Sequence, residues 1–273
     1  MNTLIPAWSE GVTALGAWTT LNVPVVAESL ALVGHDYVCL DQQHGICGDT
    51  SLIAGLMAIS AGGAAPLVRV PANEPSMISK ALDCGAEGVI IPSVNDRSEA
   101  ERAVQSCKYP PNGERSIGPI RTGGTGRERA HVPATCVVMA ESVSAMNNID
   151  EICSVPGVDA VYIGPADLAL SLGCAPSLGV APGVHAEAIA KIVASCLRHG
   201  IVTGIHCGST KQVIECAEMG FQMITISTDT QLLAAAATGR FAEVSKGLSA
   251  IPGVIRTSSP PVRSDSTEQG NTY

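Results

Sequence analysis

Charged residues are scarce in this 273-residue chain, and long apolar runs are missing from it. Asp, Glu, Lys and Arg make up only 15% of the sequence, against 46% hydrophobic residues. A weakly charged surface favours burial in a homo-oligomer. The net charge of −9, with no cluster of basic residues, argues against a nucleic-acid-binding protein, because phosphate contacts need grouped Lys and Arg.

No stretch reaches the roughly 18 uncharged apolar residues that a membrane-spanning helix needs. The best candidate, residues 27–40, is interrupted by acidic residues, a glycine and a histidine. Residues 1–16 lack the basic start of a signal peptide and contain Pro6 and Glu10. We therefore expect a cytoplasmic protein that does not bind a membrane.

The 10 cysteines include no CxxC pair, and most of them lie in apolar segments. In such segments cysteine behaves as a small hydrophobic residue. No group of Cys and His has the spacing of a structural zinc site. We expect reduced thiols, as in a cytosolic protein.

Short apolar runs recur along the chain and are separated by amphipathic segments. The runs are residues 14–18, 37–40, 66–70, 88–91, 136–139, 160–163, 201–205 and 223–226. They are rich in Val and Ile and apolar on both faces, as buried parallel strands are. Eight such alternations predict one (β/α)8 TIM barrel over residues 1–252. The rival, a doubly wound sheet, usually has a Gly-rich first turn, and no GxGxxG follows the first run.

The segments between the runs read as helices. Residues 142–153 have apolar side chains at helical spacing and predict one helix. Pro24, Pro75 and Asp96 lie where helices should begin. Irregular structure is expected at residues 109–131 and 173–182, and disorder is expected in the tail at 253–273.

Functional side chains of such barrels lie at the carboxyl ends of the strands. Glu141 and Asp167 follow neighbouring strands, about 4.8 Å apart. Two carboxylates this close repel each other unless a proton or a cation lies between them. Oxygen ligands suit Mg²⁺ or Mn²⁺. Asp167 alone could equally be a helix cap, and it is the convergence with Asp41, His44 and Arg69 on one rim that favours a site.

The placement of lysine bears on the reaction chemistry. None of the five lysines follows an expected strand. An aldolase that works through a Schiff base needs a lysine inside the barrel mouth. A metal is therefore the favoured electron sink.

The chain resembles the HpcH/HpaI family of class II pyruvate aldolases, from about residue 13 to residue 245. The matching segments are Gly-Ala-Trp at 16–18, Asp-Gln-Gln-His-Gly at 41–45, Val-Arg-Val-Pro at 68–71, Leu-Asp-Cys-Gly at 82–85, Tyr-Pro-Pro-Asn-Gly-Glu-Arg-Ser at 109–116 and Tyr-Ile-Gly-Pro-Ala-Asp-Leu at 162–168. The resemblance implies a barrel of the phosphoenolpyruvate/pyruvate-domain type, assembled as trimers or hexamers.

The resemblance also implies roles for individual residues. Glu141 and Asp167 would hold a divalent metal, Mg²⁺ or Mn²⁺, with Co²⁺ also possible. His44 would be the acid–base group, made more basic by Asp83, with Asp41 nearby.

On the substrate side, the resemblance implies that Arg69 stabilises an enolate. The backbone amides of Ala166 and Asp167 would bind the carboxylate of pyruvate. The residues expected to line the substrate site are Trp18, Gly164, Pro165, Ala166 and Asp167.

The reaction implied is cleavage of a 4-hydroxy-2-oxo acid to pyruvate, or hydroxypyruvate, and an aldehyde, together with the reverse addition. Two departures from the family bear on this expectation. Gln43 stands where the family often has Glu, and Met139 stands where it often has a Gln that contacts substrate. Met cannot donate that hydrogen bond. Two alternatives remain open: decarboxylation of a 2-oxo diacid such as oxaloacetate, and a non-catalytic relative that binds pyruvate and metal.

Overall fold

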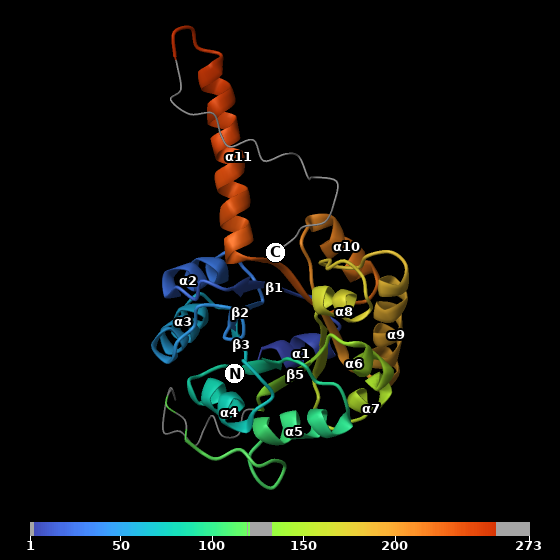
Figure 1. Ribbon diagram of the computed structural model, residues 1–273. Coiled ribbons are helices and arrows are strands. Elements are labelled where there is room, and N and C mark those ends of the chain that lie inside the picture. Colours follow the sequence, from blue (N-terminus) through green and yellow to red (C-terminus); the bar gives the residue numbers. More distant parts are fainter. Residues whose placement is uncertain (1–2, 119, 121–132, 255–273) are drawn as a thin grey trace.

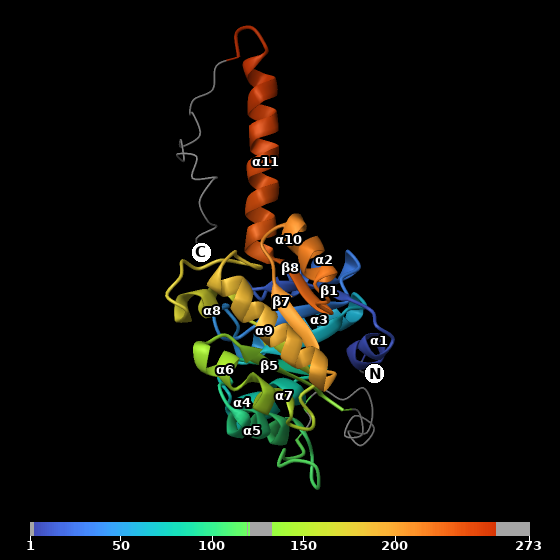
Figure 2. The same ribbon diagram turned by 90° about the vertical axis from the view of Figure 1, so that its right-hand side faces the viewer.

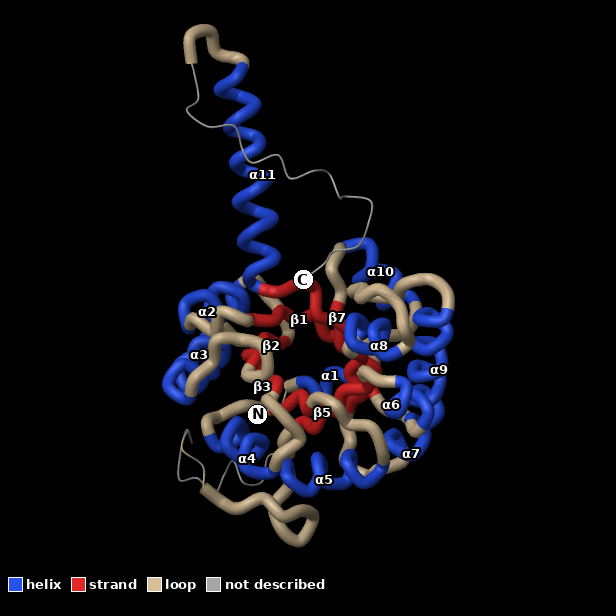
Figure 3. The backbone as a smooth tube through the Cα atoms, in the orientation of Figure 1, coloured by secondary structure: helices blue, strands red, loops and turns tan. Residues whose placement is uncertain are grey.

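In the computed structural model, which describes residues 3–118, 120 and 133–254, parallel strands close into a barrel in sequence order (Figures 1 and 3). The strands are β1 (Ala14–Thr19), β2 (Tyr37–Asp41), β3 (Ala65–Arg69), β4 (Gly88–Ile91), β5 (Thr135–Ala140), β6 (Ala160–Ile163), β7 (Val202–His206) and β8 (Met223–Thr228). Each predicted apolar run overlaps one of these strands. The predicted (β/α)8 barrel is therefore confirmed.

Helices surround the barrel and connect consecutive strands (Figure 2). They are α1 (Leu4–Ser9), α2 (Pro24–Leu32), α3 (Asp49–Ala61), α4 (Pro75–Asp83), α5 (Arg97–Cys107), α6 (Val143–Asn147), α7 (Ile149–Cys153), α8 (Pro165–Ser171), α9 (Val184–His199), α10 (Thr210–Glu218) and α11 (Asp229–Ser249). The predicted starts are confirmed: Pro24 and Pro75 are the first residues of α2 and α4, and the Asp96 side chain caps α5 by accepting a hydrogen bond from the Glu99 amide. No helix in this part of the chain is long and apolar enough to cross a membrane.

The prediction of one helix over residues 142–153 is wrong. The segment forms two short helices, α6 and α7, which meet at Asn148. Asn148 leaves helical geometry (φ −98°, ψ 13°), and its side-chain amide donates to the carbonyl of Asn95, 2.9 Å away. Asn forms such side-chain bonds to backbone readily, at the expense of helix continuity. The apolar spacing persists across this break, which is why the pattern did not reveal it.

Residues 173–182 are irregular, as predicted, and so are the described residues of the 109–131 loop. The remainder of that loop, at 119 and 121–131, lies outside the described residues. The same holds for 255–273, which form most of the tail expected to be disordered.

The core has two layers. One cluster fills the inside of the barrel and includes Tyr37, Leu67, Ile90 and Tyr162, all at most 1% exposed. The other, larger cluster lies between the barrel and the helices. Side chains alternate between these layers along each strand, because neighbouring residues of a strand point to opposite faces. The packed interior leaves only the ends of the barrel for a site.

Helix α11 departs from the usual arrangement. It projects away from the barrel instead of lying along it (Figures 1 and 2). Apolar side chains are consequently exposed on it, namely Leu232, Leu233, Phe241 and Val244. Leu15, which points outward from β1, is also 37% exposed. The outer side of β1 is therefore only partly covered at Leu15.

Candidate active site

The carboxyl ends of β2 and β3 place an ion pair at the barrel mouth. Asp41 and Arg69 are paired residues at the ends of these neighbouring strands. The guanidinium donates from Nε to Asp41 Oδ1 (2.9 Å) and from Nη2 to Oδ2 (2.5 Å). Burial alone would raise the pKa of Asp41, but the hydrogen bonds and charge of Arg69 outweigh it, so that the pKa lies below its usual value. Arg69 is therefore held in one orientation by a charged, bidentate contact.

Trp18 of β1 supports this arginine from the barrel side. The Arg69 guanidinium carbon lies 5.1 Å from the centre of the indole ring, a cation–π contact. The same ring meets His206 edge-on, with ring centres 5.7 Å apart. Burial, followed by the charge of Arg69, lowers the pKa of His206 to about 4. His206 is therefore neutral at physiological pH. Trp18 itself is 3% exposed and packs beneath Arg69 as a rigid support.

Glu141, the residue after β5, faces the start of α8. Its Oε1 accepts from the backbone N–H of Ser93 (2.7 Å) and from the Ser93 hydroxyl (3.3 Å). Its Oε2 lies 2.6 Å from the point where a Cβ on Gly164 would be, so only glycine leaves room for it. Glu141 thus has one oxygen fixed and the other directed towards the first turn of α8, which contains Asp167.

The electrostatics of this pair fit a bound cation. Burial, with a further contribution from the negative charge of Asp167, raises the pKa of Glu141. Asp167 is exposed and caps no helix; Gly164 is the N-cap residue of α8. No cluster of three or more His, Cys, Asp or Glu occurs among the residues described in the structure. Glu141 and Asp167 alone could give a hard cation two carboxylate ligands, and water and substrate oxygens would have to complete its shell.

The first turn of α8 also offers backbone donors. Pro165 occupies the first helical position, followed by Ala166 and Asp167. The N–H groups of a first helical turn have no partner within the helix and point towards the space before it. These amides and the Glu141 carboxylate thus border the same region.

His44 lies in the loop after β2 and is exposed. Its backbone N–H donates to Asp41 Oδ1 (3.2 Å), and its imidazole makes no hydrogen bond within the described ranges. The carboxylate of Asp83 is bound by Arg115 Nη2 at 2.6 Å. The structure therefore joins the His44 backbone to Asp41, the partner of Arg69, and it pairs Asp83 with Arg115.

The lysines lie away from the strand ends, as predicted. Four are helical, in α4, α9, α10 and α11, and Lys108 directly follows α5. None of the five lysines lies on a strand, so none projects from the barrel wall where a Schiff base would form.

Ser93 is a site residue that the sequence reasoning missed. It has a positive φ of 56°, unusual for a residue other than glycine, and this conformation turns its N–H towards Glu141. Ser93 lies two residues after β4. The strand-end rule would have included it, had it been extended past Pro92.

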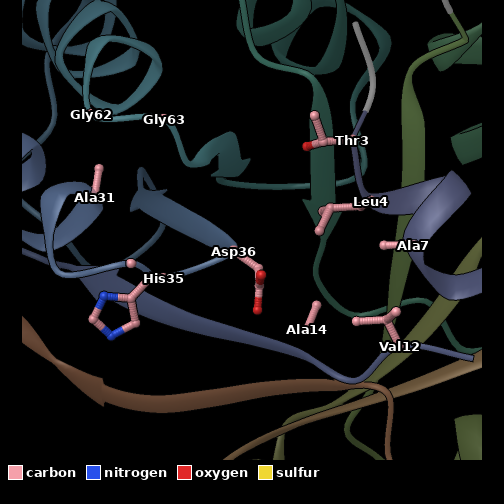
Figure 4. A pocket seen from close by; sticks show the side chains of 11 residues that line it. Thr3, Leu4, Ala7, Val12, Ala14, Ala31, His35, Asp36, Gly62 and Gly63 are labelled. Carbon is pink, nitrogen blue, oxygen red and sulfur yellow. The ribbon is translucent and has the colours of Figure 1, made fainter.

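A separate cavity of about 290 Å³ lies at the other end of the barrel, where the strands begin (Figure 4). Two of its polar atoms are engaged: Asp36 Oδ2 accepts from the Leu15 amide (2.7 Å), and His35 Nδ1 contacts the Leu30 carbonyl (2.8 Å). The cavity lies at the end of the barrel opposite to the mouth that carries Arg69 and Glu141.

Comparison with known proteins agrees with this geometry. The profile of the HpcH/HpaI aldolase/citrate lyase family matches residues 14–236, and the chain belongs to this family. Hydroxypyruvate/pyruvate aldolase from Rhizorhabdus wittichii is 40% identical over 242 residues, which are 87% of this chain and 96% of that protein. A 5-keto-4-deoxy-D-glucarate aldolase of Salmonella newport is 35% identical over 223 residues, covering 79% and 86% of the two chains.

Solved structures show the same likeness. The crystal structure of an HpcH/HpaI aldolase/citrate lyase family protein from Burkholderia cenocepacia superposes with a TM-score of 0.83 at 30% identity. The match covers 90% of this chain and all of that one. The crystal structure of macrophomate synthase superposes with a TM-score of 0.78 at 25% identity, over 90% and 87% of the two chains.

Proposed function

We propose that this protein is a metal-dependent aldolase. It cleaves a 4-hydroxy-2-oxo acid to pyruvate, or hydroxypyruvate, and an aldehyde, and it catalyses the reverse addition. The observation that carries the proposal is the pair Glu141 and Asp167 opposite Arg69 at a barrel mouth that has no lysine. The relatives named hydroxypyruvate/pyruvate aldolase and 5-keto-4-deoxy-D-glucarate aldolase support the substrate class.

Glu141 and Asp167 would hold the divalent cation, Mg²⁺ or Mn²⁺, with Co²⁺ as a further candidate. When bound, the cation supplies positive charge that stabilises an enolate oxygen. Ser93 keeps Glu141 in place through its N–H and hydroxyl. The Gly164 position keeps the space beside Glu141 open.

The substrate carboxylate would accept hydrogen bonds from the amides of Ala166 and Asp167, while Gly164 and Pro165 shape the turn that presents them. Arg69 places a fixed positive charge near the oxygen that becomes negative during cleavage. Asp41 and Trp18 prevent the guanidinium from turning away.

His44 would take the proton from the C4 hydroxyl during cleavage and return it during addition. Its imidazole is exposed at the mouth, and Asp41 fixes the adjacent backbone. The expected effect of Asp83 on the basicity of His44 remains a prediction. In the structure the Asp83 carboxylate binds Arg115.

Decarboxylation of a 2-oxo diacid such as oxaloacetate is the second candidate. It would form the same enolate but needs no base for a C4 hydroxyl. Met139 is the reason for keeping the other alternative, a non-catalytic relative: its side chain is apolar, 3% exposed and lies beside Gly164, so it supplies no hydrogen-bond donor there. Loss of one donor alters substrate orientation rather than the electron sink.

We also propose a homo-oligomer, a trimer or a hexamer, as the working assembly. The projecting α11 exposes Leu233, Phe241 and Val244, and β1 exposes Leu15 on its outer face. A second copy of the chain that covers these side chains would bury apolar surface on both partners.

The test of the function is a substrate screen. Purified protein with Mn²⁺ is incubated with pyruvate or hydroxypyruvate and a panel of aldehydes, and products are identified by mass. The expected result is an adduct of the 2-oxo acid with at least one aldehyde. Decarboxylation of oxaloacetate without any adduct would favour the second candidate, and no reaction at all would favour a non-catalytic relative.

A further inference from the structure

Asp229, the first residue of α11, is a buried carboxylate for which the proposed chemistry has no use. It is 4% exposed, and its oxygens accept hydrogen bonds from the turn after β1. Oδ1 accepts from Thr20 N (3.0 Å) and Thr20 Oγ1 (2.9 Å), and Oδ2 accepts from Thr19 Oγ1 (2.6 Å) and Leu21 N (3.1 Å). Four contacts to three consecutive residues fix this turn more firmly than one cap would.

This turn also forms hydrogen bonds with the loop that carries His44. The carbonyl of Thr20 accepts from the amide of Ile46 at 2.8 Å. The side-chain amide of Asn22 donates to the carbonyl of Asp41 at 2.9 Å and to that of Thr20 at 3.3 Å. His44 lies between Asp41 and Ile46, so the turn is hydrogen-bonded to the loop on both sides of His44.

The two loops meet closely at Gly45, next to His44. A Cβ on Gly45 would lie 2.4 Å from the Asp41 carbonyl oxygen, 2.6 Å from Asn22 Nδ2 and 2.9 Å from the Thr20 carbonyl oxygen. Backbone therefore packs directly on backbone here. Asn22 itself has a positive φ of 51° and is 2% exposed, so the surrounding contacts hold it in an uncommon conformation.

We propose that Asp229 and Asn22 are positioning residues for His44, acting through the turn at residues 19–22. This inference rests on the proposed function, in which His44 moves the C4 hydroxyl proton. The buried carboxylate fixes the turn, and the turn's bonds to Asp41 and Ile46 set where the His44 loop lies. A misplacement of about 1 Å at a reacting group can lower a rate by about 10²-fold.

A merely structural role predicts something different. If Asp229 only stabilised the fold, its loss would lower every activity of the site in step with stability. A positioning role lowers the step that needs His44 and spares a reaction that does not. Oxaloacetate decarboxylation supplies that comparison, because it needs no base for a C4 hydroxyl.

The experiment compares Asp229→Asn and Asn22→Ala with wild type. Asparagine keeps the shape of Asp229, but its Nδ2 cannot accept hydrogen bonds from the turn. Asp150→Asn is the control: it makes the same substitution at an exposed aspartate on the outer helices, whose Oδ1 accepts from the Ser195 hydroxyl (2.7 Å) and the Arg198 guanidinium (2.6 Å). Aldol cleavage and decarboxylation are measured with Mn²⁺, and hydrogen exchange is followed at the amides of residues 43–46.

We expect Asp229→Asn to lower kcat for cleavage by about 10- to 100-fold, with decarboxylation within about twofold of wild type. Exchange at residues 43–46 should accelerate in both variants and stay unchanged in Asp150→Asn. Equal losses in both reactions, or unchanged cleavage, would overturn the proposal. Should Asp229→Asn not fold, Asn22→Ala decides by the same criteria. If wild type cleaves no aldol, the proposed function fails. Unchanged hydrogen exchange at residues 43–46 in both variants would independently contradict the positioning role.

Discussion

Replacing Gly164 with alanine places a methyl group where the Glu141 carboxylate now lies. The new Cβ would be 2.6 Å from Glu141 Oε2, 3.0 Å from Glu141 Cβ and 3.2 Å from the Met139 methyl carbon. The backbone at Gly164 (φ −84°, ψ 90°) has a negative φ, so the effect comes from crowding rather than from a conformation reserved for glycine. Glu141 cannot simply move aside, because Ser93 holds its other oxygen at 2.7 Å.

The displaced carboxylate should bind metal less well. Disturbing the surroundings of a metal ligand typically lowers affinity by about 10- to 100-fold, which is about 1.4–2.8 kcal/mol. Isothermal titration with Mn²⁺ measures this directly. Gly48→Ala is the control, since it also has a negative φ (−90°) and no atom lies within 4 Å of its added Cβ. If Gly164→Ala bound Mn²⁺ as tightly as wild type, Glu141 would not be the ligand that we propose.

Three further outcomes concern the rim and the assembly. Asp41→Asn removes the negative charge that faces the largely buried Arg69 guanidinium and keeps one acceptor oxygen, so it should lower the free energy of unfolding in urea by about 1.5–3 kcal/mol at pH 7. Because the folded-state pKa of Asp41 is lowered, the stability that Asp41 contributes is complete above the unfolded pKa of about 3.9 and is lost as pH falls through the folded value. An equal difference in unfolding free energy between wild type and Asp41→Asn at pH 7 and well below pH 3.9 would contradict this assignment. His44→Ala should lower aldol cleavage by about 10²–10⁴-fold while sparing Mn²⁺ affinity and decarboxylation; wild-type cleavage would instead make His206 the next candidate base. Light scattering at micromolar concentration should give a trimer or a hexamer, and Phe241→Glu should shift it towards monomer; a monomeric wild type would refute the assembly.

The barrel was predictable because its strands are short, apolar on both faces and separated by segments with helical patterns. Strand ends then placed Asp41, Arg69 and Glu141 on one rim, since parallel strands all end on the same face. What could not be predicted depends on contacts between distant segments. Asp229 reads as an ordinary helix start, and only the structure shows it beside Thr20, more than two hundred residues earlier in the chain.

The direction of α11 could not be predicted from the sequence either. Its apolar residues suit a helix that packs on a surface, but they do not say which surface. The break at Asn148 went unseen because apolar spacing continues on both sides of it. The partner of Asp83 was also inaccessible, because Arg115 lies in an irregular loop whose path has no periodic pattern.

The most direct test of the proposed mechanism is the metal dependence of aldol cleavage in wild type and Glu141→Gln. The variant removes the negative charge that would hold the cation and keeps the side-chain shape. EDTA should abolish cleavage by wild type, and Mn²⁺ or Mg²⁺ should restore it. Glu141→Gln should stay inactive at the metal concentrations that restore wild type. Full activity in EDTA, or trapping of substrate on a lysine by borohydride, would contradict a metal-dependent aldolase.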